Sequence, residues 1–238
     1  MGNSISPHIE NAQKTGVCSL KAMKLKELPP EISKLPKTLR TLELSNNSLK
    51  NIPDVIGQFQ MLKTLSVNQN QLVDISQQID KLIKLETLAL SSNHLTSFSL
   101  SNAGKMKHLK TVNLSHNRLK SFPIHLCNLP NLDALDLSNN SITTLPDDVK
   151  NLKAIELNLN NNKLNRLNNG LCQCERLKVL RVEENCLDIS SMTEAILKQS
   201  KISLIAFDGN TFDMKKFQEC DGYEEYISRY AATKKKVA

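Results

Sequence analysis

Apolar and polar residues follow an eleven-residue pattern that returns eight times along the chain. Each copy has apolar residues at positions one, four, six and eleven, an asparagine at position nine, and mostly polar residues elsewhere. The copies are LRTLELSNNSL, LKTLSVNQNQL, LETLALSSNHL, LKTVNLSHNRL, LDALDLSNNSI, AIELNLNNNKL, LKVLRVEENCL and ISLIAFDGNTF. Their asparagines are Asn47, Asn70, Asn93, Asn117, Asn140, Asn162, Asn185 and Asn210, at successive spacings of 23, 23, 24, 23, 22, 23 and 25 residues. A repeat of this length predicts a solenoid, in which each unit buries its apolar face against its neighbours.

Positions three to six of each copy predict a short strand, because alternate residues in a strand point to opposite faces. Positions four and six then face the core, while positions three and five face solvent. Stacking the units gives one parallel sheet, and its solvent-facing positions are the candidate partner surface. The residues assigned to that surface are Glu43, Ser66, Thr87, Asn113, Asp136, Asn158 and Arg181.

The asparagine at position nine ends each strand. Its side-chain amide both donates and accepts hydrogen bonds, so it satisfies buried backbone groups where the chain turns inward. We therefore interpret the eight asparagines of the repeat as a structural ladder, and not as ligands of a bound molecule.

The second half of most units contains proline followed by apolar residues at helical spacing, as in IPDVIGQF from Ile52 and LPDDVKNL from Leu145. Proline fixes the backbone after the strand, so this pattern predicts a short helical or irregular segment on the convex side. The proline is missing in some units, among them those at Ile75-Ser76 and at Phe98-Ser99. The convex geometry is hardest to predict in these two units.

The two ends of the chain predict caps. Ser6 is expected to be the N-cap of a short helix with Pro7 at its first position and Gly16 after its end. Near the other end, Tyr223, Tyr226 and Tyr230 share a helical face, which predicts a helix over the last repeat; phosphorylation or stacking of the tyrosines is the alternative. The predicted organisation is an N-terminal anchor and short cap helix in 1–14, a cap unit plus eight repeats in 15–212, and a C-terminal cap helix with a basic tail in 213–238.

The repeat resembles the leucine-rich repeat family over about residues 15 to 212. The resemblance implies an α/β solenoid of horseshoe type, with a parallel concave sheet and short helical or irregular convex segments. It identifies a scaffold, whereas function depends on the side chains that the scaffold displays.

Catalytic and metal-binding motifs are missing from the sequence. There is no glycine-rich phosphate loop, H-E-x-x-H or G-x-S-x-G, and the five histidines lie in different parts of the chain. Cys172 and Cys174 are separated by one residue and have no second pair, unlike a zinc site. We therefore expect no catalytic residues, no metal and no cofactor, and we expect the six cysteines to be reduced thiols.

The net charge of +7 comes partly from a basic segment that includes Lys105, Lys107, Lys110, Arg118 and Lys120, and partly from the terminal lysines. Solvated lysines explain both groups. Nucleic-acid binding would need aromatic interleaving or a continuous basic stripe, and neither is evident in the sequence. We therefore predict a protein partner and no nucleic acid.

The segment Met1-Gly2-Asn3-Ser4-Ile5-Ser6 fits the N-myristoylation pattern, with lipidation at Gly2, although Pro7 is disfavoured directly after the serine. A single acyl chain gives reversible membrane attachment, and no run of about 18 apolar residues is present. These features predict a cytoplasmic monomer with peripheral, lipid-anchored membrane association. The predicted function is a non-enzymatic protein-interaction module or adaptor. The alternative is a regulatory subunit that positions an enzyme such as a phosphatase.

Overall fold

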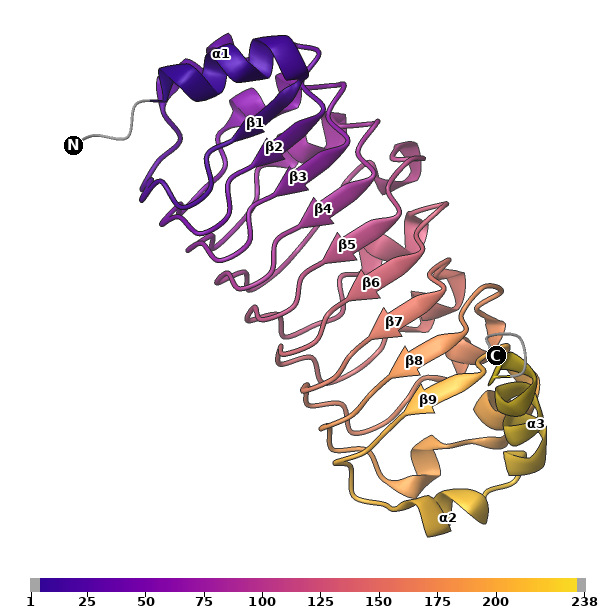
Figure 1. Cartoon of the computed structure of the whole chain (residues 1–238). Helices are drawn as coiled ribbons and strands as arrows, with labels where there is room; N and C mark the ends of the chain where they lie inside the picture. The colour runs from indigo at the N-terminus through magenta and orange to yellow at the C-terminus, as the bar shows by residue number, and fades with distance from the viewer. Residues whose placement is uncertain (1–4, 235–238) are drawn as a thin grey trace.

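The computed structural model describes residues 5–234, and it contains one sheet of nine parallel strands that follow each other in chain order (Figure 1). The strands are β1 (Val17–Ser19), β2 (Thr41–Glu43), β3 (Thr64–Ser66), β4 (Thr87–Ala89), β5 (Thr111–Asn113), β6 (Ala134–Asp136), β7 (Glu156–Asn158), β8 (Val179–Arg181) and β9 (Leu204–Ala206). Equivalent positions pair, so that Thr41 lies opposite Thr64 and Thr64 lies opposite Thr87. The sheet remains open, and the predicted leucine-rich repeat solenoid is confirmed.

Short helical segments return the chain on the other side of the stack (Figure 1). Eight are 3₁₀ helices and the ninth, η9, is π-helical: η1 (Pro30–Lys34), η2 (Asp54–Gln58), η3 (Gln77–Lys81), η4 (Ala103–Lys105), η5 (Ile124–Asn128), η6 (Asp147–Asn151), η7 (Asn169–Gln173), η8 (Ile189–Ser191) and η9 (Ala195–Gln199). Pro53 and Pro146 directly precede η2 and η6, where proline holds the backbone extended. The predicted convex segments are therefore confirmed.

The units at Ile75-Ser76 and Phe98-Ser99, which lack the proline, begin their helical segments in different ways. Before η3, the side-chain oxygen of Ser76 accepts a hydrogen bond from the backbone N–H of Gln78 over 3.1 Å, and a five-residue helix still forms. In the unit that starts at Phe98, the helical segment is only three residues long. A side-chain cap thus replaces the rigid proline in one unit, whereas the other forms a shorter helix.

The core is continuous along the solenoid because every unit buries the same positions. In the fifth strand unit, Leu109, Val112 and Leu114 are fully buried. After each strand the residue at position eight, such as His116 with φ 54°, adopts a left-handed backbone conformation. This turn brings the following asparagine into the core, where Asn117 is 9% exposed.

Helix α1 (Ser6–Thr15) covers the N-terminal end of the stack and buries Ile9 and Ala12. Gly16 ends the helix with φ 73°, and its N–H donates to the carbonyl oxygen of Ala12 over 2.9 Å. The prediction of Ser6 as N-cap was wrong: Ser6 is the first helical residue, Ile5 is the N-cap, and no side chain caps the helix. Pro7 explains this, because proline is pre-organised for the first turn and lacks an N–H that would need a cap.

Helices α2 (Met214–Gln218) and α3 (Tyr223–Lys234) lie at the C-terminal end of the stack (Figure 1). Phe217 of α2 is buried and its ring lies 4.6 Å from that of Phe207, at the end of the last strand unit. On α3, Tyr226 is buried, and the guanidinium of Arg229 donates to backbone carbonyl oxygens, among them that of Ile202 over 3.1 Å. These helices bury apolar side chains of the last unit. They also form hydrogen bonds with backbone groups that would otherwise pair with a further repeat.

Candidate partner-binding surface

The exposed face of the sheet displays the side chains at positions three and five of each strand. In β2 to β9 both positions are partly exposed, while the residue between them is buried. All seven residues assigned to the partner surface from the sequence lie on this face. Six form one row at position five: Glu43, Ser66, Asn113, Asp136, Asn158 and Arg181. Thr87 lies at position three of β4, in the adjacent row.

Several side chains of the position-five row are held by the backbone of their own unit. The Asp136 carboxylate accepts a hydrogen bond from the N–H of Ser138 over 2.9 Å. Asn113 and Asn158 make the same contact to the residue two positions later, over 2.9 and 3.0 Å, and Glu43 does so over 2.8 Å. A partner therefore meets side chains whose conformations are already fixed, which lowers the entropy lost on binding.

The charge of this face changes along the solenoid. In its N-terminal half, β3 and β4 carry only serine, alanine and threonine at positions three and five, and β2 carries Thr41 and Glu43. From β6 onward, positions three, five, seven and eight hold five acidic side chains and one cation: Asp136, Glu156, Glu183, Glu184, Asp208 and Arg181. Arg181 donates from Nε to Glu156 Oε1 over 2.8 Å, so it is already paired within the sheet. The C-terminal half of the face is therefore negative.

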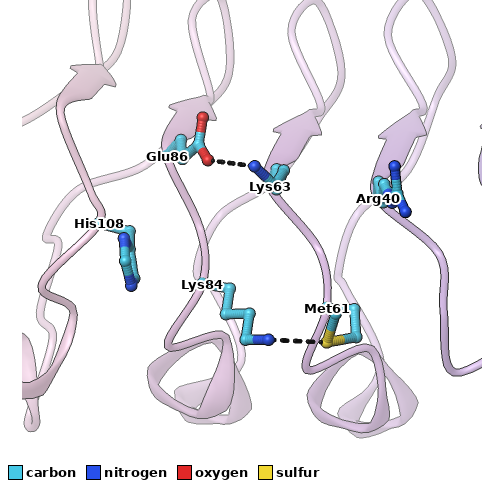
Figure 2. Close-up of a pocket in the computed structure, with 6 residues that line it drawn as sticks. All are labelled: Arg40, Met61, Lys63, Lys84, Glu86 and His108. Carbon is cyan, nitrogen blue, oxygen red and sulfur yellow. Dashed lines mark hydrogen bonds and ion pairs between the residues drawn. The ribbon is translucent and has the colours of Figure 1, made fainter.

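A row of basic side chains lies where the chain enters the strands. We call it the basic entry row; its members are exposed and precede β2, β3, β4, β5 and β8: Arg40, Lys63, Lys84, Lys107, Lys110 and Lys178. Figure 2 shows Arg40, Lys63 and Lys84 around one open pocket with Met61, Glu86 and His108. The hydrogen bond from Lys63 Nζ to Glu86 Oε1, 2.7 Å long, lowers the pKa of the Glu86 carboxyl.

The basic entry row was missed in the sequence because most of its members lie in different repeats. The sequence joined Lys107 and Lys110 to Arg118 and Lys120 as one basic segment. In the structure, Lys110 directly precedes β5, whereas Arg118 follows that strand and its turn. The strand thus separates the two pairs. Aligning the units places Arg40, Lys63, Lys110 and Lys178 at position two, a column that also contains Glu86 and Asp133.

The asparagines at position nine bridge neighbouring units. The Asn117 amide nitrogen donates to the carbonyl oxygens of Leu90 in the preceding unit and Leu114 in its own, both over 3.0 Å. Its oxygen accepts from the N–H of Leu95 over 3.0 Å. The same arrangement recurs at Asn47, Asn70, Asn93, Asn140, Asn162, Asn185 and Asn210. These contacts engage the asparagine side chains within the core.

Within residues 5–234, no group of three or more histidine, cysteine, aspartate or glutamate side chains could hold a metal ion. Cys174 is buried and its Sγ donates to the carbonyl oxygen of Val149 over 3.1 Å. Burial raises the pKa of the Cys174 thiol to about 12.

The predicted lipidation site, Gly2, lies outside the described residues, and no helix in the described part of the chain is long and apolar enough to cross a membrane.

Comparison with known proteins agrees with this architecture. Leucine-rich repeat sequence families match residues 38–59, 83–142 and 107–156. A leucine-rich repeat protein of Leptospira interrogans is 28% identical with a TM-score of 0.66, and the match covers 89% of this chain and 58% of that one. The plant peptide hormone receptor RGFR1 in complex with RGF2 is 25% identical with a TM-score of 0.63, over 86% of this chain and 35% of that one. Internalin C2 of Listeria monocytogenes, at 17% identity and a TM-score of 0.68 over 87% and 91% of the two chains, shares the fold. These matches support the leucine-rich repeat family.

Proposed function

We propose that this chain is a non-enzymatic protein-interaction module that binds a segment of a partner protein on the exposed face of its sheet. The observation that carries the proposal is the position-five row, in which three side chains on the successive strands β5 to β7 are held by hydrogen bonds to the backbone of their own unit, as is Glu43 on β2. Neighbouring strands in a sheet are about 4.8 Å apart, so Asn113, Asp136 and Asn158 present polar groups at regular intervals. An extended partner segment can contact several of them at once.

Two further observations support this proposal. Leucine-rich repeat scaffolds typically act in protein interactions, and one structural neighbour, the receptor RGFR1, was solved in complex with RGF2. The negative C-terminal half of the face also gives the surface a direction, because a partner with unevenly distributed positive charge is attracted to one end. A scaffold that binds several partners and a subunit that positions one enzyme would both use such a face.

Proximity labelling in cells, followed by pull-down with the purified full chain, tests the proposal. The substitution Asp136→Lys on β6 is expected to lower the amount of partner recovered by on the order of tenfold, because it reverses a fixed charge in the row. Asp148→Lys is the matched control, since Asp148 is exposed on η6, away from the sheet. Equal losses of partner recovery for the two variants would show that the partner does not bind the exposed face of the sheet. Recovery of a catalytic partner in stoichiometric amount would favour the regulatory-subunit role.

We also propose that a myristoyl group on Gly2 anchors the module reversibly to membranes. The sequence Met1-Gly2-Asn3-Ser4-Ile5-Ser6 supports this proposal, whereas Pro7 weakens it. One acyl chain binds a membrane only marginally, so a second contribution is needed. Lys21, Lys24 and Lys26 are exposed in the unit that α1 covers, and they provide positive charge near that end of the solenoid.

A further inference from the structure

A pocket of about 310 Å³ lies on the exposed face at its C-terminal end, between β9 and the helices α2 and α3. Leu204 and Ala206 of β9 contribute its sheet side, and Met214, Tyr223 and Ile227 contribute from the helices. Met214 is 52% exposed, although it is a large apolar side chain. Partly exposed apolar and aromatic side chains in a concave site are typical of the places where interfaces gain most of their binding energy.

The walls of this pocket are held in place by contacts within the cap. The Tyr226 hydroxyl oxygen accepts a hydrogen bond from the N–H of Ile205 over 3.1 Å, which fixes α3 against the last strand. The ring of Phe217 lies 5.5 Å from that of Tyr223 and 5.4 Å from that of Tyr226, with edge-to-face geometry in both pairs. The pocket is therefore pre-formed, and an apolar side chain can enter without reorganising the cap.

The rim of the pocket continues into the acidic end of the sheet. Asp208 follows Ala206 by two residues, is exposed, and makes no side-chain hydrogen bond to the described residues. Glu184, in the equivalent turn of the neighbouring unit, lies against Gly209, where a Cβ would meet the Glu184 carboxylate. Arg181 also lines the pocket, but Glu156 pairs with it. The charge on the sheet side of the pocket is therefore negative and complementary to lysine or arginine, whereas Lys234 lies over the ring of Tyr230 on the helix side.

We infer that this end of the face binds a partner segment in which one large apolar side chain is followed or preceded by lysine or arginine. The apolar side chain enters the pocket beside Ala206, and the basic side chains lie along Glu183, Glu184 and Asp208. This inference rests on the proposed function, because it assigns the chemistry of the partner to the same exposed face. It adds that the anchoring contact lies at the C-terminal cap.

Selection of a displayed library of random twelve-residue peptides on the purified full chain tests this inference. We expect the enriched peptides to share a leucine, methionine or aromatic residue within a few positions of lysine or arginine, and their binding to weaken with added salt. Binding of synthetic versions can then be measured by fluorescence anisotropy. A selection that enriches no such pattern overturns the inference.

Two variants locate the bound peptide. Ala206→Phe fills the pocket without changing the charge, and we expect it to weaken binding by on the order of tenfold. Ala232→Phe is its control, because Ala232 is exposed on α3 and does not line the pocket. Asp208→Asn removes one charge, and we expect it to weaken binding by about threefold, whereas Asp148→Asn on the convex side leaves binding unchanged. The unfolding midpoint of each variant shows that it is folded.

The outcomes separate this inference from the proposed function. Loss of binding with Ala206→Phe and Asp208→Asn supports the pocket as the anchor. If Asp136→Lys abolishes binding while those two variants retain it, the pocket is not the anchor and the proposed function stands. If none of the three variants changes binding, the peptide binds outside the exposed face and both proposals are wrong.

Discussion

The hydroxyl oxygen of Tyr226 in α3 accepts a hydrogen bond from the backbone N–H of Ile205 in β9 over 3.1 Å. In the inner strands, the equivalent residue lies opposite a residue of the next strand, as Leu180 of β8 lies opposite Ile205 of β9. Ile205 has no following strand in the sheet, and the side chain of Tyr226 supplies the acceptor instead. Burial raises the pKa of the Tyr226 phenol, so the hydroxyl stays neutral.

Removing this hydroxyl should destabilise the fold. Tyr226→Phe keeps the ring but leaves the buried N–H of Ile205 without its acceptor, at a cost of about 1 to 3 kcal/mol in free energy of unfolding. Denaturant titration followed by circular dichroism measures the change. Tyr230→Phe is the control, because Tyr230 is only partly buried. Equal midpoints for the two variants would show that the contact with Ile205 contributes nothing to stability.

Loss of one ladder asparagine should also act on stability. Asn117→Ala removes an acceptor and several donor contacts to buried backbone groups, and each group left unsatisfied costs about 1 to 3 kcal/mol. Asn128→Ala, at an exposed position of η5, is expected to have little effect. Equilibrium unfolding in urea compares the two variants. An unchanged midpoint for Asn117→Ala, combined with loss of partner binding, would make Asn117 a ligand and not a structural residue.

The cysteines should differ sharply in reactivity. Cys186 is exposed, whereas Cys18, Cys127 and Cys174 are buried. Burial raises the pKa of the Cys18 thiol to about 11, which disfavours the reactive thiolate. Brief treatment of the native protein with a maleimide, followed by peptide mass spectrometry, is expected to modify Cys186 first and the three buried thiols only after unfolding. Rapid native modification of Cys127 would show that the convex side opens locally.

The same buried thiols predict a decrease in stability at high pH. Burial raises the pKa of Cys127 and Cys174 to about 12, from an ordinary value of 9.0. Between these values the unfolded chain releases the proton and the folded chain keeps it, so the stabilisation present below pH 9.0 is lost as pH rises towards 12. Each thiol contributes a slope of about 1.4 kcal/mol per pH unit in the free energy of unfolding. Replacing both cysteines with alanine is expected to make this slope shallower; an identical slope would contradict the assignment.

Membrane association should depend on Gly2. Protein purified from eukaryotic cells is expected to lack Met1 and to carry a myristoyl group, and part of it should sediment with membranes in a salt-sensitive manner. Gly2→Ala should abolish both the added mass and the membrane fraction. Intact-mass spectrometry determines whether Gly2 carries the myristoyl group. A chain that retains Met1, or that has a free or acetylated Gly2 amine, would show that the proposed anchor is wrong. The proposed partner surface does not depend on this result.

The sequence alone was sufficient to predict the repeating unit and to tell the buried face of the sheet from the exposed one. The apolar residues at positions four and six specify which side of each strand is buried, because a shift by one residue would expose them all. Every unit repeats this requirement, so neighbouring strands pair at equivalent positions, as Thr87 and Thr111 do. The position of Asp136 on the exposed face follows directly. Gly16 likewise marked the end of α1, since glycine adopts its φ of 73° without steric cost.

Tertiary structure decided which separate residues meet. The basic entry row joins Arg40, Lys63 and Lys84 from successive units, and β5 separates Lys110 from Arg118. At the C-terminal cap, the pocket beside Ala206 depends on how α2 and α3 pack against β9. A periodic pattern specifies the contact of each unit with an equivalent neighbour, but the last unit has no such neighbour. Its packing depends instead on the shapes of Phe217 and Tyr226 and on the hydrogen bond to Ile205, which only the folded chain brings together.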